Sequence, residues 1–321
     1  MDNSNKDAPR IVILGSVNMD LVFRTPRMPG KGETISGHQF LQVSGGKGAN
    51  QAVAAARQGA QVSLLARVGD DAMGRQLCQT LAQDGIDIAA VQAVPGVATG
   101  VAGILVDDGG ENSIVLAAGA NACIGAAEVA AQAEMIRAAD FLVCQLETPL
   151  AGVEQAISIA HQAGVPVIFN PTPVQDLSDA LLAQVDYLIV NETEAAQLSG
   201  IAVPDSAAAG QAAQKLLARG ARQVVVTLGA QGVLLAFKQQ AADGASGMRL
   251  LPSFSVQALD TTAAGDTFVG TLAVGLGRGQ SLTDACATAQ AAAAISVTRL
   301  GAQSSIPQRA EVAAFLVQHA G

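Results

Sequence analysis

Apolar runs rich in β-branched residues alternate along the chain with alanine-rich segments of helical spacing. The segments at 49–58 and 150–162 predict helices, closed by Gly59 and Gly164. Short strands that are apolar on both faces are predicted at 10–14, 61–67, 139–145, 165–169, 187–190 and 223–228. This alternation indicates an α/β fold, with a mostly parallel sheet flanked by helices on both faces.

Two stretches toward the N-terminal end lack helical spacing. One covers 37–43, and the other covers 99–116, where two extended runs flank the turn at 107–110. We interpret them as a small antiparallel β lid, inserted at about 20–43 and 98–119 into a single α/β domain over 8–321. Edge hairpins on the main sheet are the alternative.

Composition and charge narrow the possible partners. The 321 residues carry a net charge of −9, which argues against binding nucleic acid or an anionic membrane through a general basic surface. No stretch approaches the ~18 uninterrupted apolar residues of a membrane-spanning helix. The first ten residues are polar, and the four cysteines are widely spaced, which favours free thiols. We therefore expect a cytoplasmic protein.

A glycine-rich motif, SGGKGAN at 44–50, directly precedes the first predicted helix. Its three glycines allow backbone to approach a ligand closely, and the following helix begins with free N–H groups. The motif is not a Walker loop, because Gly48 follows Lys47, and it is not a dinucleotide fingerprint, because Gln51 stands at the third glycine position. A glycine-rich turn without a ligand is the alternative.

A second motif, DTTAAGDTF at 260–268, places Asp266 at the start of a predicted helix, just after Gly265. Only Thr, Ala and Gly separate Asp266 from Asp260, which leaves room for an anion at the helix N-terminus. A carboxylate there can accept a proton from a substrate hydroxyl while the helix end holds a phosphoryl group. The alternative is that Asp266 only caps the helix.

Two further motifs follow predicted strands. Asn191 and Glu194 lie where oxygen ligands would suit a hydrated Mg²⁺, and a helix capping box fits the same spacing, so both interpretations can hold. The motif TLGAQG at 227–232 is either a nucleotide-phosphate loop or an ordinary hairpin turn. Most of these motifs share the carboxyl ends of parallel strands, where open α/β sheets bind ligands, and this favours an enzyme.

The motifs together resemble the ribokinase branch of the PfkB family of sugar and nucleoside kinases. The resemblance covers the chain from Gly15 to about Pro307. It is carried by GSVNMD at 15–20, GGKGANQA at 45–52, NETEA at 191–195, DTTAAGDTF at 260–268 and VTRLGAQSSIP at 297–307.

The resemblance implies transfer of the γ-phosphoryl group of ATP to the 5-hydroxyl of D-ribose, with Asp266 as the catalytic base and Gly265 in the anion hole. It implies that the sugar is held by Asp266 together with Asn18, Asp20, Gly46, Lys47, Asn50 and Glu147. It implies ATP contacts by Asn191, Thr227, Gly229, Gln231, Gly232, Gly265 and Gln290, and help from Glu194 in placing Mg²⁺. A site for a monovalent cation such as K⁺ would comprise Asp260, Thr262, Ser296, Arg299, Gly301 and Ser305.

Two positions depart from the family pattern. Gln290 stands where Asn or His is expected beside adenine, and Leu300 stands where Lys is common. The resemblance also implies a homodimer formed through the lid. Two alternatives remain open: another PfkB kinase, with 2-deoxyribose, fructose or a nucleoside as acceptor, and a sugar-binding sensor without catalysis.

Overall fold

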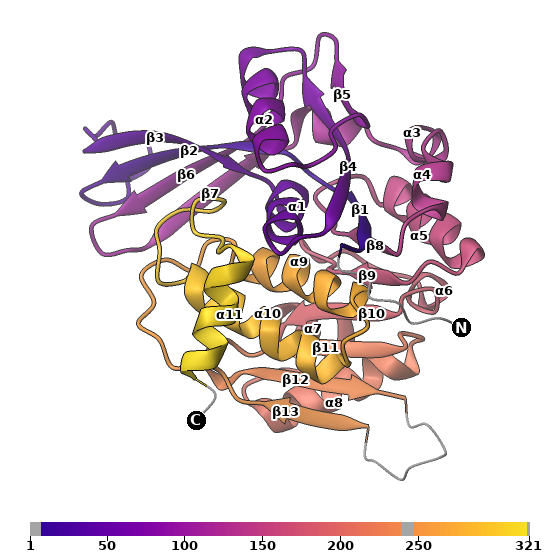
Figure 1. Ribbon diagram of the computed structural model, residues 1–321. Helices are drawn as coiled ribbons and strands as arrows, with labels where there is room; N and C mark the ends of the chain where they lie inside the picture. The colour runs from indigo at the N-terminus through magenta and orange to yellow at the C-terminus, as the bar shows by residue number, and fades with distance from the viewer. Residues whose placement is uncertain (1–7, 239–246, 320–321) are drawn as a thin grey trace.

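The protein is described by a computed structural model that covers residues 8–238 and 247–319 (Figure 1). The centre is a nine-stranded sheet in the order β13-β12-β11-β10-β9-β8-β1-β4-β5, parallel from β5 to β11 and antiparallel at β12 and β13. The strands are β1 (Arg10–Leu14), β4 (Gln61–Gly69), β5 (Val91–Val94), β8 (Phe141–Cys144), β9 (Val167–Phe169), β10 (Tyr187–Asn191), β11 (Gln223–Thr227), β12 (Val233–Phe237) and β13 (Met248–Leu251).

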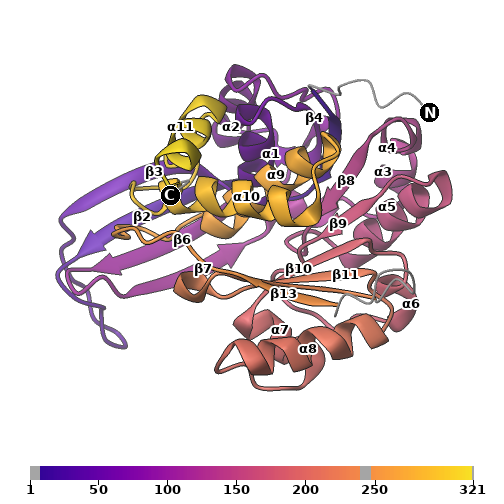
Figure 2. The same cartoon turned by 60° about the horizontal axis from the view of Figure 1, so that its bottom comes forward.

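Helices cover both faces of this sheet (Figure 2). One face carries α1 (Lys47–Arg57), α2 (Ala72–Gln83), α9 (Ala264–Gly277) and α10 (Leu282–Ser296), with α11 (Arg309–Gln318) against α10. The other carries α3 (Ala126–Ala130), α4 (Ala133–Arg137), α5 (Leu150–Ala163), α6 (Asp179–Leu182), α7 (Glu192–Ser199) and α8 (Ser206–Ala218). Within β1, Ile11 and Ile13 join the first core and Val12 and Leu14 the second, as expected for a strand that is apolar on both faces.

A separate four-stranded sheet extends from the main body (Figure 2). Its strands are, in spatial order, β3 (Gln39–Gly45), β2 (Asn18–Thr25), β6 (Gly100–Asp107) and β7 (Asn112–Ala117). Each hairpin is antiparallel, and the two hairpins join through a parallel pairing of β2 with β6. These strands form a separate sheet and not edge hairpins on the main sheet, and the first hairpin extends two residues beyond the expected 20–43 at each end, to Asn18 and Gly45.

Several boundaries follow from local chemistry. Gly164 adopts a left-handed conformation at the end of α5, as its position predicted. Helix α1 begins at Lys47, inside the glycine-rich motif, because Gly46 takes φ +92°. All four cysteines are free thiols. Among the described residues, no helix has both the length and the apolar character needed to cross a membrane.

Candidate active site

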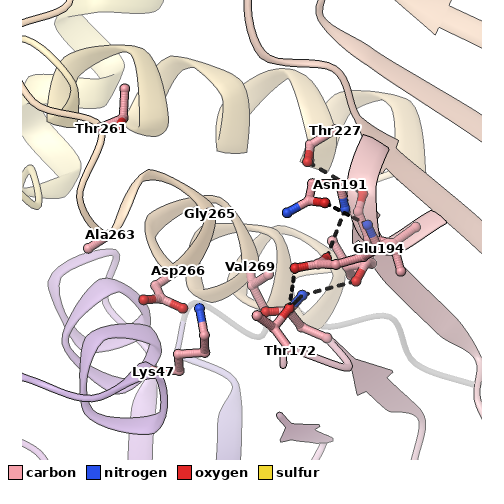
Figure 3. A pocket seen from close by; sticks show the side chains of 13 residues that line it. Lys47, Thr172, Asn191, Glu194, Thr227, Thr261, Ala263, Gly265, Asp266 and Val269 are labelled. Carbon is pink, nitrogen blue, oxygen red and sulfur yellow. Dashed lines mark hydrogen bonds between the residues drawn. The ribbon is translucent and has the colours of Figure 1, made fainter. Parts of the chain in front are cut away.

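A cavity of about 230 Å³ lies where the carboxyl ends of β10 and β11 face the N-terminus of α9 (Figure 3). This is the edge of the sheet at which the sequence motifs were expected to meet. The lining residues come from segments far apart in the sequence: Lys47, Asn170, Thr172, Ile189, Val190, Asn191, Glu194, Thr227, Thr261, Ala263, Gly265, Asp266 and Val269.

Asp266 is the third residue of α9 and is 6% exposed. The residue before the helix, Ala263, has φ +59°, the single positive φ of a non-glycine residue in the described part of the chain. Such strain, of order 1 kcal/mol or more, persists only where the surroundings impose it. A Cβ at Gly265 would meet nothing within 4 Å. Glycine is therefore not required here by packing, and its absent side chain leaves space beside the backbone N–H of Gly265, which lines the cavity.

Two consecutive amides of α1 hold the Asp266 carboxylate. Asn50 Nδ2 donates to Asp266 Oδ2 at 3.0 Å, and Gln51 Nε2 donates to Asp266 Oδ1 at 3.0 Å. Both amides are buried. An unpaired buried carboxylate would be costly, so these two donors fix where the carboxylate lies. The structure thus places Asn50 beside Asp266.

Lys47 supplies a positive charge to the same cavity, and Figure 3 shows its ammonium pointing toward the carboxylate of Asp266. Burial lowers the pKa of Lys47, but the nearby carboxylates of Asp266, Glu147 and Glu194 outweigh it and raise the pKa above its usual value. The side chain therefore stays protonated, and an anionic ligand entering the cavity would meet a cation.

Asp20 and Glu147 lie on the side of the small sheet. Glu147 Oε2 accepts from Ser16 Oγ at 2.6 Å and from the Lys47 backbone N at 3.2 Å. A Cβ at Gly45 would lie 2.2 Å from Asp20 Oδ2, so glycine makes room for this carboxylate. Burial, followed by the charges of Glu147 and Asp266, raises the pKa of Asp20 to about 7.

Asn18 is buried beside this group, and its Oδ1 accepts from Asn121 Nδ2 at 2.7 Å. Asp20 also borders a second cavity of about 1010 Å³. This larger cavity separates the small sheet from the loops at 258–262 and 300–304. Gly46 lines neither cavity. A Cβ at this position would lie 2.7 Å from the backbone N of Asn18, so glycine allows the two backbone segments to lie this close together.

Asn191 and Glu194 form the capping box of α7. Asn191 Oδ1 accepts from the backbone N of Glu194 at 2.9 Å, and Glu194 Oε2 accepts from the backbone N of Asn191 at 2.9 Å. Glu194 Oε1 accepts from Thr172 Oγ1 at 2.5 Å. Both residues line the cavity, so the cap and a ligand contact are compatible.

No group of three or more His, Cys, Asp or Glu side chains within the described residues could enclose a metal ion. A single carboxylate in the cavity fits Mg²⁺ that keeps most of its waters and binds phosphates. Glu194 is such a carboxylate, with its orientation already fixed by the capping box.

The segment after β11 contributes less to the cavity than expected. Thr227 lines it, whereas Gly229, Gln231 and Gly232 lie outside the lining, in a hairpin turn into β12. A Cβ at Gly232 would lie 2.0 Å from the carbonyl oxygen of Leu251, so packing alone requires this glycine. Gln290 donates from Nε2 to the carbonyl of Pro252 at 3.1 Å and does not line the cavity.

The residues expected to bind a monovalent cation are only partly brought together. Asp260 accepts from the backbone N of Thr262 and of Gly301, both at 2.9 Å, which ties the two loops to one carboxylate. These hydrogen bonds lower the pKa of Asp260 although burial opposes them. The guanidinium of Arg299 pairs with Glu311 and, being a cation without an acceptor atom, cannot itself ligate K⁺, so only the backbone of Arg299 could serve a cation.

The hydroxyls of Ser296 and Ser305 donate to carbonyls within their own turns, those of Ala293 at 2.8 Å and Ala302 at 2.7 Å. Ser296, Arg299 and Ser305 line neither of the two cavities. Any cation that they help to bind would therefore lie outside both cavities.

Sequence reasoning missed four polar side chains at this edge: Gln51, Gln145, Asn170 and Thr172. Asn170 follows the strand Val167–Phe169, so the rule that picked out Asn191 could have found it. Gln51 stands out only as an amide within an Ala- and Val-rich helix. Its burial, at 0% exposed, could not be told from the sequence.

Comparison with known proteins confirms the family that the sequence motifs resemble. The model of the pfkB family carbohydrate kinases matches residues 8–309. The chain is 46% identical over 310 residues to the ribokinase of Haemophilus influenzae, covering 97% of this chain and 99% of that protein. It is 35% identical over 298 residues to the deoxyribokinase of Salmonella typhi, covering 92% and 95%.

A solved structure of Arabidopsis thaliana ribokinase complexed with ribose and ATP superimposes with a TM-score of 0.89 at 32% identity. The superposition covers 96% of this chain and 99% of that one. The family model and these relatives span nearly the whole chain. The chain therefore belongs to the PfkB family of carbohydrate kinases.

Proposed function

We propose that this protein transfers the γ-phosphoryl group of ATP to the 5-hydroxyl of D-ribose, giving D-ribose 5-phosphate and ADP. One observation carries the proposal: Asp266 is buried at the N-terminus of α9, in a polar cavity, with both oxygens held by amide donors. The identity to the ribokinase of Haemophilus influenzae and the likeness to a ribokinase complexed with ribose and ATP support ribose and ATP as the substrates.

The reaction needs a proton acceptor and a site for the transferring group. Asp266 takes the proton of the 5-hydroxyl while the hydroxyl oxygen forms a bond to the γ-phosphorus. The bond from that phosphorus to the bridging oxygen breaks, and ADP leaves. The backbone N–H of Gly265 and the ammonium of Lys47, which both line the cavity, would face the charge on the phosphoryl oxygens. General-base catalysis contributes about 10²- to 10⁴-fold.

We assign the sugar hydroxyls to Asn18, Asp20, Lys47, Asn50 and Glu147, with Gly46 allowing close approach. A sugar offers many hydroxyls and little apolar surface, so its site needs carboxylates and amides in fixed positions. Asn18, Asn50 and Glu147 already make hydrogen bonds, and Asp20 and Lys47 lie close to other charged groups.

We assign the nucleotide to Asn191, Thr227, the hairpin turn with Gly229, Gln231 and Gly232, and Gln290. Glu194 would hold Mg²⁺ through the water molecules of the ion. The bound Mg²⁺ would neutralise part of the charge of the phosphates. Asp260 and the carbonyls around it would hold K⁺, because carbonyl oxygens suit a large, weakly hydrated cation.

We further propose that the small sheet covers the sugar and pairs with a second copy of the chain. Every residue of β7 is exposed, and the large apolar side chains exposed on this sheet are Phe23, Phe40, Leu41, Ile114, Val115 and Leu116. A small sheet left alone presents pairing edges, so a partner sheet is its natural cover. The four free thiols support a cytoplasmic location.

A coupled assay of ADP release across pentoses, hexoses and nucleosides tests the proposal. We expect the highest kcat/KM with D-ribose. A higher value with 2-deoxyribose, as the deoxyribokinase relative would favour, or with fructose or a nucleoside, would assign another acceptor to the same chemistry. Sugar binding by isothermal titration without any ADP release would instead identify a sensor.

A further inference from the structure

Gln51 uses every part of its buried amide. Its Nε2 donates to Asp266 Oδ1 at 3.0 Å and to Asn170 Oδ1 at 3.3 Å, and its Oε1 accepts from Gln145 Nε2 at 2.6 Å. The side chain is 0% exposed and does not line the cavity. It therefore touches the proposed base without being placed to touch a substrate.

The direction of these hydrogen bonds is fixed by groups that can only accept. Asn170 Nδ2 donates to the backbone carbonyl of Ile189 at 3.0 Å, which turns Asn170 Oδ1 toward Gln51. The carboxylate of Asp266 also accepts. Rotating the Gln51 amide would set its oxygen against both acceptors, so only Nε2 can face them.

The same chain of bonds continues to the nucleotide side of the cavity. Asn170 Nδ2 also donates to Thr172 Oγ1 at 3.1 Å, and the Thr172 hydroxyl donates to Glu194 Oε1 at 2.5 Å. Asp266 and Glu194 are thus both acceptors at the two ends of one network, joined through buried amides (Figure 3 shows the Thr172 end). A buried hydrogen-bond network has few alternative arrangements, because each broken bond leaves a further polar group unpaired.

We propose that Gln51, held in place by Asn170, is a positioning residue for phosphoryl transfer. It fixes the position of the Asp266 carboxylate relative to the groups around Glu194. The inference rests on the proposed role of Asp266 as the base, and it holds for any acceptor sugar. Loss of the Gln51 amide lowers kcat and leaves the substrate affinities nearly unchanged, because Asp266 is misplaced while the binding groups remain.

Gln51→Met keeps the size of the side chain and removes its polar atoms. We expect kcat to fall about 10- to 100-fold, as for a misplaced catalytic group, with KM for sugar and for ATP changed less than about threefold. Gln58→Met is the matched control, because Gln58 is the C-cap of the same helix, is 3% exposed, and its side-chain amide donates to the carbonyl of Pro307 at 3.0 Å, away from Asp266. It should lose comparable stability and keep the wild-type kcat.

A double mutant separates positioning from a general loss of structure. If Gln51 acts through Asp266, adding Gln51→Met to Asp266→Asn lowers the residual kcat by less than about twofold. Should Gln51→Met fail to fold, Gln51→Glu serves instead: it keeps the shape and the acceptor for Gln145, sets a carboxylate against Asp266 Oδ1, and should lose kcat similarly.

Three outcomes overturn the inference: losses that multiply in the double mutant, equal kcat for the Gln51 and Gln58 variants, or a raised KM with kcat kept. Each variant is assayed on whichever sugar the wild type phosphorylates best. Failure of ribose as that sugar would count against the proposed function alone.

Discussion

The two sheets differ in how deeply their side chains are buried. Every residue of β8 and β9 is buried between two layers of helices, whereas every residue of β7 is exposed. At the carboxyl edge of the large sheet, polar groups such as Asp266 and Glu194 have their hydrogen-bond partners already in place. The small sheet instead presents apolar groups that lack cover within the described chain. This difference agrees with the proposed division, in which the chemistry takes place at the edge of the large sheet and the exposed sheet covers the sugar and associates with a second copy.

The strongest test of this division removes the proposed base. Asp266→Asn should lower kcat by about 10²- to 10⁴-fold, because the amide cannot take the proton of the attacking hydroxyl. Calorimetric affinities for ribose and ATP should remain close to those of the wild type. A loss of kcat below about tenfold would remove Asp266 from the role of base.

The opposite test changes the small sheet. Val115 is 72% exposed, and Val115→Asp should weaken self-association by about tenfold or more, because it would place a charge within the paired surface. Sedimentation over a range of concentrations measures this. Val317→Asp is the control, since Val317 is 79% exposed on α11, outside the small sheet, and should leave association unchanged. A wild type that sediments only as the 32.2 kDa chain at micromolar concentration would contradict the proposed dimer.

A smaller effect is expected from the loops between the two regions. Initial rates should be several-fold higher in K⁺ than in Na⁺ salts at constant ionic strength, because a bound cation would order the loop that precedes Gly265. Asp260→Asn should reduce this dependence. Equal wild-type rates in Na⁺, K⁺ and Cs⁺, together with an unaffected variant, would leave the cation site without support.

The smallest effect concerns Asp20, where the two sheets meet. Its pKa is raised to about 7 in the folded protein, mainly by burial, so the folded state binds the proton more tightly than the unfolded state. The contribution of the protonated Asp20 carboxyl to the free energy of unfolding is therefore fully present below about pH 4, and it is lost as the pH rises through 7. Asp20→Asn should therefore raise Tm relative to the wild type at pH 8 more than at pH 5, measured without ligands. An equal difference at both pH values would contradict the raised pKa.

Sequence patterns predicted the fold well because burial on both faces leaves a continuous apolar signature in each strand. The runs at 10–14 and 187–190 became β1 and β10 almost residue for residue. The candidate site was predicted where a polar residue follows a strand or a glycine, as with Asn191 and Asp266. Gln51 and Gln145 escaped prediction because their role depends on contacts across 215 and 94 positions of sequence, which no local pattern encodes. The parallel joining of β2 and β6 is likewise a long-range property.

The pairing of Asn18 with Gly45 has a consequence for how the chain could have acquired its second sheet. The polypeptide leaves the end of β1 and returns to the start of α1 at directly neighbouring positions, so the whole first hairpin is an excursion from an ordinary strand-to-helix connection. The second hairpin joins at the same place, because Asn18 also pairs with Gly100. Both hairpins can therefore grow or shrink at their far ends, at 26–38 and 108–111, without altering the central architecture. Changes of sequence and length in the small sheet would therefore be tolerated at 26–38 and 108–111, and constrained where Asn18 pairs with Gly45 and Gly100.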